Sequence, residues 1–173
     1  MPTILTVLAI CLAETNLRNV VNHKDGGSPS YGICQIKEGT AAWMDPQTSK
    51  KRLMDHNINL KVAARYFEYQ MSKYGSERKA ISAYNAGRAI TGNAAYVRRV
   101  LRQRQRLIAV LPLIRQNPNT LFGLFGLQFS EEIQHQLQNA VRLNTGDKCQ
   151  DFRQAQKNSQ NHFQLIHKNS VRK

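Results

Sequence analysis

The chain opens with an apolar segment whose pattern predicts a helix from about Pro2 to Leu17. The apolar positions that recur at the i, i+3, i+4 and i+7 spacing of one helical face are Ile4, Val7, Leu8 and Cys11. Glu14 follows three residues later, at the edge of the same face. A carboxyl group packed against apolar side chains loses hydration in its charged form, so we expect its pKa to be raised. Taken alone, a glutamate at the end of an apolar helix is usually solvated.

Helical signals continue through most of the first 109 residues. Asp55 is suited to cap a long helix from His56 to Tyr74, and Gly75 is suited to end it. Three further patterns predict helices over 39–44, 79–84 and 94–109. Asp45-Pro46 ends the first, Asn85-Ala86-Gly87 ends the second, and Asn93 starts the third.

Only one region between these helices reads as irregular structure. Residues 22–30 are dense in turn formers and predict a loop, and residues 31–36 alternate weakly, as in a short extended piece. No run is long enough for a substantial sheet. The predicted fold class is therefore mainly α, with a short irregular or β-like loop region.

The pattern weakens after Pro112. An apolar, glycine-interrupted run covers 120–127, Ser130-Glu131-Glu132 resembles a helix start, and residues from about 150 are rich in Gln, Asn and Lys. We expect the apolar run to pack on its own domain rather than on a membrane or a partner. The sequence thus predicts a helical domain at 1–109 and a helical, basic C-terminal extension of unknown role at 110–173.

The net charge of the chain limits the kinds of partner that it attracts. The chain has 25 Lys and Arg against 11 Asp and Glu, a formal net charge of +14, and most of the excess lies in the first 109 residues. Such a chain attracts polyanions, of which nucleic acid and the bacterial cell wall are both candidates. No zinc-finger spacing, aromatic RNA-binding motif or long basic stripe favours specific binding to nucleic acid.

The three cysteines, Cys11, Cys34 and Cys149, form no CxxC pair. Their number fits one bridge or three free thiols, and Cys11 is expected to be a small buried hydrophobe. No Lys or Arg precedes the first apolar segment, so we interpret it as a helix of the domain and recognise no signal peptide. No segment has the roughly 18–20 apolar residues of a membrane span.

Four short motifs then occur in order. They are Ala13-Glu14-Thr15-Asn16, Tyr31-Gly32-Ile33-Cys34-Gln35, Asn57-Ile58, and Ala83-Tyr84-Asn85-Ala86-Gly87 followed by Tyr96-Val97. Each motif is weak alone, but together, in this order and spacing, the chain resembles the SLT-type lytic transglycosylases over about residues 4–105. The resemblance implies the lysozyme-like fold that this family shares with goose-type lysozymes.

The resemblance also implies roles for individual residues. Glu14 would be the single catalytic acid and later the base, and the Tyr84 hydroxyl would support it. Gln35 and Asn85 would contact sugar in the groove. Ser30, Tyr31 and Asn57, which lie in or beside the same motifs, are further candidates for substrate binding.

One carboxylate suffices for this chemistry. In a transglycosylase Glu14 would protonate the oxygen between N-acetylmuramic acid and N-acetylglucosamine, and then draw the proton from the C6 hydroxyl, which closes a 1,6-anhydro ring. No metal or cofactor is needed. A goose-type lysozyme would instead hydrolyse the bond, with an aspartate that positions water. Asp25 is the candidate for this role, although an aspartate before two glycines is more often a turn residue.

Departures and alternative interpretations remain at single positions. Thr15 and Cys34 stand where the family usually has serine and methionine, and Tyr31 stands where several members have a small residue. Without the motifs, Tyr84 reads as core, Asn85 as a helix C-cap and Gln35 as a partner of loop amides. Trp43 is expected to anchor the core rather than to stack on sugar.

The sequence therefore predicts an enzyme that acts on the glycan strands of peptidoglycan, at the bacterial cell wall, and we expect it to be a monomer. A second hypothesis is a wall-binding or virion protein that keeps the fold without activity. A third is a basic nucleic-acid binder, for which the chain offers no motif.

Overall fold

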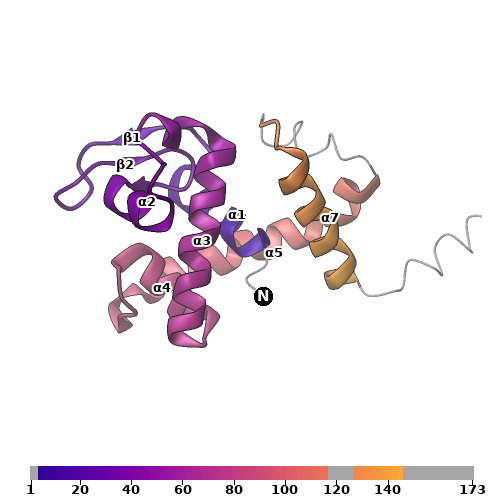
Figure 1. The fold of residues 1–173 in the computed structure, drawn as a ribbon. Coiled ribbons are helices and arrows are strands. Elements are labelled where there is room, and N and C mark those ends of the chain that lie inside the picture. Colours follow the sequence, from indigo (N-terminus) through magenta and orange to yellow (C-terminus); the bar gives the residue numbers. More distant parts are fainter. Residues whose placement is uncertain (1–3, 117–126, 146–173) are drawn as a thin grey trace, which may run out of the picture.

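The computed structural model describes residues 4–116 and 127–145, with side chains described for 4–110 and 127–140. The described chain is mostly helical and carries one small sheet (Figure 1). The helices are α1 (Ile4–Thr15), α2 (Glu38–Met44), α3 (His56–Tyr74), α4 (Glu77–Ala86), α5 (Ala94–Gln116) and α7 (Glu131–Thr145), with 3-10 turns η1 (Arg52–Met54) and η2 (Thr91–Asn93).

Helix α1 lies at the centre of the molecule, between α3, α5 and α7 (Figure 1). Every residue from Ile4 to Cys11 is buried, and not only the single apolar face that the spacing indicates. Neighbours on several sides explain the difference, because a helix surrounded by other helices has no solvent face. Glu14 and its neighbours in the last turn are the first part of α1 to reach solvent.

The sheet holds three antiparallel strands in the order β1 (Val21–Asn22), β2 (Ser30–Tyr31) and β3 (Ile36–Lys37). The expected single extended piece over 31–36 is therefore wrong, because residues 32–35 turn back and pair Tyr31 with Ile36. Gly32 permits this turn, since it has φ +76° and a Cβ there would lie 2.3 Å from the Asn59 side chain.

The predicted signals at helix ends are confirmed in several places. The Asp55 carboxylate accepts hydrogen bonds from the backbone N–H groups of Asn57 and Ile58 at the start of α3. Gly75 and Gly87 take left-handed conformations at the ends of α3 and α4.

The basic helix is longer than expected, because α5 runs on to Gln116 with Pro112 inside it. α5 packs against α1, α4 and α7. The division that we propose at residue 109 thus falls within α5. The helix start expected at Ser130 is confirmed by α7, whereas most of the apolar run at 120–127 and all residues after 145 lie outside the described residues.

Candidate functional site

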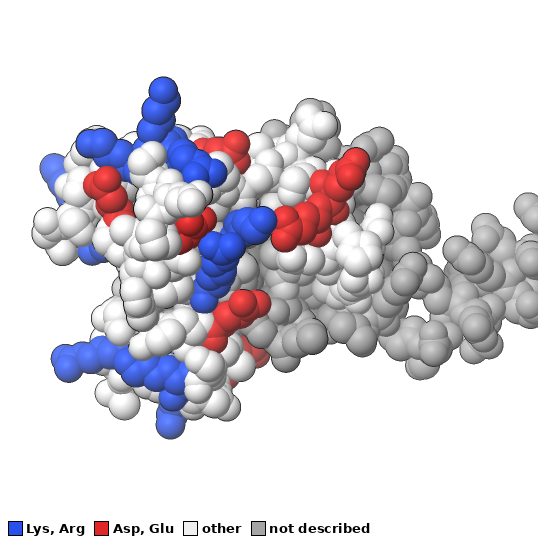
Figure 2. Space-filling view, in the orientation of Figure 1, with Lys and Arg blue, Asp and Glu red and all other residues white. Residues whose placement is uncertain are grey.

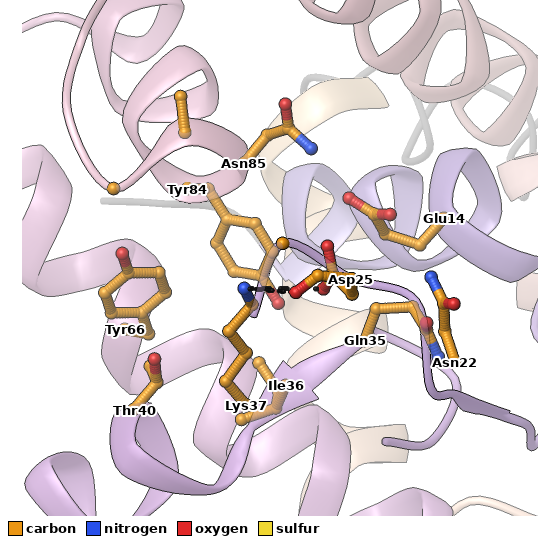
Figure 3. Close-up of a pocket in the computed structure, with 13 residues that line it drawn as sticks. Glu14, Asn22, Asp25, Gln35, Ile36, Lys37, Thr40, Tyr66, Tyr84 and Asn85 are labelled. Carbon is orange, nitrogen blue, oxygen red and sulfur yellow. Dashed lines mark hydrogen bonds and ion pairs between the residues drawn. The ribbon is translucent and has the colours of Figure 1, made fainter. Parts of the chain in front are cut away.

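Glu14 sits in the last turn of α1, half-buried, and faces the sheet region and α4 (Figure 3). The Tyr96 hydroxyl, on α5, donates a hydrogen bond of 2.5 Å to its Oε1. Burial raises the pKa of the Glu14 carboxyl, and the charge of Asp25 raises it further. The hydrogen bond from Tyr96, the Arg99 charge and the Asn85 amide act in the opposite direction, but the net pKa shift is upward.

A groove of about 420 Å³ opens beside Glu14. It lies between the sheet region and the C-terminal end of α4 (Figure 3). Its lining residues are Glu14, Asn22, Asp25, Gly26, Gln35, Ile36, Lys37, Thr40, Tyr66, Tyr84, Asn85, Ala86 and Gly87. The groove therefore gathers Glu14, Gln35, Tyr84, Asn85 and Asp25, which lie far apart in the sequence.

Gln35 is held firmly in the wall of the groove. It takes a left-handed conformation with φ +54°, and its side-chain amide donates to the carbonyls of Gly32 and Val20 at 2.9 and 3.2 Å. Its Oε1 accepts a 2.7 Å hydrogen bond from the hydroxyl of Ser30, which is fully buried. Ser30 thus orients Gln35. The alternative interpretation of Gln35 as a partner of the loop backbone agrees with its bonds to the Gly32 and Val20 carbonyls.

Tyr84 lies under the groove, but its hydroxyl does not contact Glu14 in the way that the resemblance implies. It donates a 3.1 Å hydrogen bond to the Cys34 carbonyl. Burial raises its pKa well above the usual value of 10.0, and the Glu14 charge adds to this, so the hydroxyl stays protonated. The hydroxyl that does contact Glu14 belongs to Tyr96, which the sequence placed in a motif without assigning it a role.

Tyr96 is nearly buried, and the Arg99 guanidinium lies 5.3 Å from the centre of its ring. Burial is the largest cause that raises the Tyr96 pKa well above 10.0, followed by the Glu14 charge. A tyrosine that keeps its proton is a permanent donor to the carboxylate. In the sequence, Tyr96 was marked only by the Tyr96-Val97 pair that follows the last motif. Tyr96 lies two positions after the start of α5, and both residues of the pair are buried.

Asn85 and Asp25 line the same groove as Glu14. Asn85 is exposed at the end of α4, and its Oδ1 accepts a 3.2 Å hydrogen bond from the Asn93 amide. Asp25 lies in the loop between β1 and β2, where the Lys37 ammonium donates to its backbone carbonyl at 2.8 Å and lies 3.9 Å from its carboxylate. Lys37 therefore ties this loop to β3 across the groove.

Besides Ser30, two of the expected binding residues lie outside the lining of this groove. Tyr31 is half-buried, and its carbonyl accepts a hydrogen bond from Asn59. Asn57 faces the start of α7, where its Oδ1 accepts a 2.9 Å hydrogen bond from the Ser130 N–H, and it lines a separate pocket. Asn57, which we expected to bind substrate, thus lies on the side of α3 that faces α7 and not in the groove beside Glu14.

The asparagine that serves the site is Asn59, which sequence reasoning missed. It is fully buried, accepts from the Cys34 N–H at 2.8 Å, and donates to the carbonyls of Tyr31 and Leu53 at 2.9 and 3.0 Å. It therefore fixes the turn that carries Gln35. The spacing of Asn59 to Ala63 and Tyr66, i to i+4 and i+7, places it on the buried stripe of α3 and was a usable signal.

Cys11 and Cys34 form a disulfide that joins α1 to the same turn. Cys11 is one helical turn before Glu14, and Cys34 directly precedes Gln35. The bridge therefore links the helix that carries Glu14 to the turn that carries Gln35. Of the two possibilities that the cysteine count left open, one bridge is the one observed, and Cys149 lies outside the described residues.

Trp43 corrects another expectation. The side chain does not anchor the core but is 55% exposed on α2. Its ring contacts Tyr69 and Tyr66 on α3 at centroid distances of 4.5 and 6.4 Å. The helix α2 has seven residues and buries only Ala41, so Trp43 stays largely exposed although one edge of it meets α3.

Within the residues that the structure describes, no group of three or more His, Cys, Asp or Glu side chains is placed to hold a metal ion. In the same part of the chain, no helix has the length and apolar character to cross a bilayer.

The arrangement defines a mostly helical, lysozyme-like domain in which Glu14 and Asp25 line an open groove. The family model of the transglycosylase SLT domain matches residues 4–105, and the chain belongs to this family. No curated protein and no solved structure matched the chain at a significant level. The matched segment contains every element that lines the groove.

Proposed function

We propose that this chain is a peptidoglycan lytic transglycosylase that cleaves the β-1,4 bond between N-acetylmuramic acid and N-acetylglucosamine. The single observation that carries the proposal is Glu14, a half-buried carboxylate with a raised pKa beside a groove in a transglycosylase SLT domain. A carboxyl group of this kind retains its proton closer to neutral pH and can donate it to a leaving group.

In the first step Glu14 donates its proton to the glycosidic oxygen. The bond from that oxygen to C1 of the muramoyl sugar breaks, and N-acetylglucosamine leaves with a free hydroxyl. The positive charge left at C1 is shared with the muramoyl 2-acetamido group. Tyr96 keeps the carboxylate oriented and stabilises the negative charge that Glu14 acquires.

In the second step the Glu14 carboxylate accepts the proton of the C6 hydroxyl of the same sugar. O6 then bonds to C1 and closes the 1,6-anhydro ring, and Glu14 regains its acidic form. No water is consumed and no second carboxylate is required, in contrast to glycosidases that use a carboxylate pair.

Gln35 and Asn85 are the proposed contacts to the sugars beside the scissile bond, because both line the groove next to Glu14. Tyr84 and Asn59 support the site from below, through the backbone of Cys34. Tyr31 and Asn57 are then residues of the frame rather than of the groove.

A second candidate reaction is hydrolysis of the same bond, with Asp25 positioning a water. The observation in its favour is that Lys37 holds Asp25 in the groove that Glu14 lines. We favour the anhydro product, because the C6 hydroxyl is part of the bound substrate and has a high effective concentration at C1.

Digestion of purified peptidoglycan, followed by mass spectrometry of the fragments, tests the proposal. We expect 1,6-anhydromuramoyl ends, and a Glu14→Gln variant about 10²–10⁴ slower, because an amide cannot donate the proton. Fragments heavier by one water, absent with an Asp25→Asn variant, would assign hydrolysis. If the parent chain does not cleave peptidoglycan, the result favours a wall-binding or virion protein on the same fold.

We further propose a monomer that acts at the bacterial cell wall, with the extension after residue 109 as an accessory segment. Specific binding to nucleic acid is not part of the proposal.

A further inference from the structure

Trp43 is an aromatic side chain in an unusual position. Its side chain is 55% exposed, and the other large hydrophobic residues exposed in the described chain are Val20 and Ile90. Tryptophan is strongly buried on average, because its ring carries more apolar area than most side chains. An exposed indole on a surface helix therefore calls for a ligand or a packing reason.

The indole is held by its neighbours. The Tyr69 ring lies 4.5 Å away at 75°, and the Tyr66 ring lies 6.4 Å away at 70°, both as edge contacts. The Lys73 ammonium lies 5.9 Å from the centre of the Tyr69 ring. We call Trp43 and Tyr69 the aromatic platform. Rings fixed in this way offer contact area at a small cost in conformational entropy.

The aromatic platform continues directly from the groove. Tyr66 lines the groove and also contacts Trp43, and Thr40 lines the groove three residues before Trp43 on α2. Figure 3 shows Thr40 and Tyr66 at the end of the groove opposite to Glu14 and Asn22. The platform thus lies beyond the far end of the groove, away from the catalytic carboxylate.

The chemistry of the platform fits a sugar ring better than a protein partner. A single exposed tryptophan is too small for a stable protein interface, which needs roughly 1,000 Å² or more. A pyranose presents an apolar face of C–H groups and polar hydroxyls at its rim, so one face can pack on an indole while the rim stays in water. A glycan strand that leaves the groove at Tyr66 meets Trp43 next.

We infer that Trp43 and Tyr69 form a distal glycan subsite, on which a sugar of the same strand packs several positions from the bond cleaved at Glu14. The inference rests on the proposed function, since it takes the glycan strand as the substrate. Its consequence is a preference for long strands over short fragments, because only long strands reach both Glu14 and Trp43.

Trp43 is the only tryptophan in the 173 residues, so the tryptophan fluorescence of the protein reports this one side chain. The experiment uses the full chain with Glu14→Gln, which slows cleavage so that binding is measured, titrated with peptidoglycan glycans of increasing length. We expect long glycans to change the fluorescence and a disaccharide to leave it unchanged. Calorimetry measures the dissociation constants in parallel.

Replacement of Trp43 by Ala in the same background should weaken binding of long glycans about tenfold and leave disaccharide binding unchanged. Trp43→Phe should recover part of the loss, because it keeps a ring beside Tyr69. Ile90→Ala is the matched control, since Ile90 is also exposed but lies outside the groove and the platform.

The outcomes separate the two proposals. If long glycans bind but leave the Trp43 fluorescence unchanged, or if the Trp43→Ala variant binds them with the same dissociation constant, the subsite alone is overturned. Equal weakening for short and long glycans would also overturn it. Absence of any glycan binding would overturn the proposed function and the subsite with it.

Discussion

At the scale of residues, the site depends on how Glu14 is solvated. Its pKa is raised above the usual value of 4.5, and burial is the largest cause. A carboxyl group whose folded-state pKa is raised stabilises the fold fully below its unfolded pKa, and this contribution is lost as the pH rises through the folded pKa. The charged form of Glu14 therefore costs stability at neutral pH.

Glu14→Gln should raise the thermal unfolding temperature at pH 7 relative to the parent chain. The gain should shrink as the pH falls and vanish below about 4.5, where Glu14 is protonated in both states. Thermal melts of both proteins over this pH range measure the difference. A gain that is constant with pH would mean that the substitution acts through packing and not through the charge.

Tyr96→Phe should move the pH profile of cleavage. Because the Tyr96 hydroxyl bonds to the charged carboxylate, its loss should raise the Glu14 pKa further and shift the alkaline limb of kcat/KM to higher pH. The maximal kcat should fall as well, since the carboxylate loses its orienting donor.

Tyr84→Phe is the matched control for this experiment. It removes a buried hydroxyl that bonds to a neutral backbone carbonyl, so kcat should fall without a shift of the alkaline limb. If Tyr84→Phe moved the limb and Tyr96→Phe did not, the Glu14 carboxyl would be paired with Tyr84 in solution.

At the scale of elements, the catalytic helix is fastened to the turn that carries Gln35. The disulfide links Cys11 to Cys34 across 23 positions of sequence, and Asn59 and Tyr84 bond to the backbone on either side of Cys34. The Thr15 hydroxyl donates to the Ile33 carbonyl at 2.6 Å and adds a further link between α1 and this turn.

Replacement of Cys11 and Cys34 together by Ala should therefore lower stability by about 3 kcal/mol, the value expected for a closed loop of this size. Denaturant unfolding of parent and variant measures the loss. Under reducing conditions the parent should fall to the level of the variant, and the variant should not change. Equal stability of the two oxidised proteins would show that the bridge constrains nothing.

At the scale of the whole molecule, charge is the dominant property. The net charge is +14, and Figure 2 shows Lys and Arg side chains over the region of the sheet and α2 and over the region of α4, the two parts that flank the groove. The surface on both sides of the proposed substrate path is thus suited to an anionic polymer.

Binding to purified cell-wall fragments should therefore weaken as the salt concentration rises, because screened charges supply much of the attraction. Pull-down at a series of salt concentrations, with the Glu14→Gln protein, measures this. Uncharged glycan oligosaccharides are the control, and their affinity should change little. A wall affinity that is independent of salt would mean that sugar contacts dominate.

Helix positions could be predicted from the sequence because their signals are local. The Asp55 cap, the left-handed Gly75 and Gly87, and the period of the long helix each depend on residues within a few positions of one another. Glu14 could also be singled out, since a carboxylate at the end of an apolar helix is visible in the sequence. The sequence did not distinguish Asn57 from Asn59, because two asparagines two positions apart on a helix face different sides, and only the packing of α3 shows which side meets the turn at Cys34.

The sequence by itself determined the helical class and several helix ends, since propensity, capping and apolar period act over short distances. Its four motifs, taken together, made Glu14 the candidate acid. The tertiary structure alone decided which side chains meet. The choice of Tyr96 over Tyr84 as the donor to Glu14, the bridge between Cys11 and Cys34 and the exposure of Trp43 all depend on how α1, α2 and α5 pack. Contacts between residues distant in sequence are set by this packing, which no local pattern encodes.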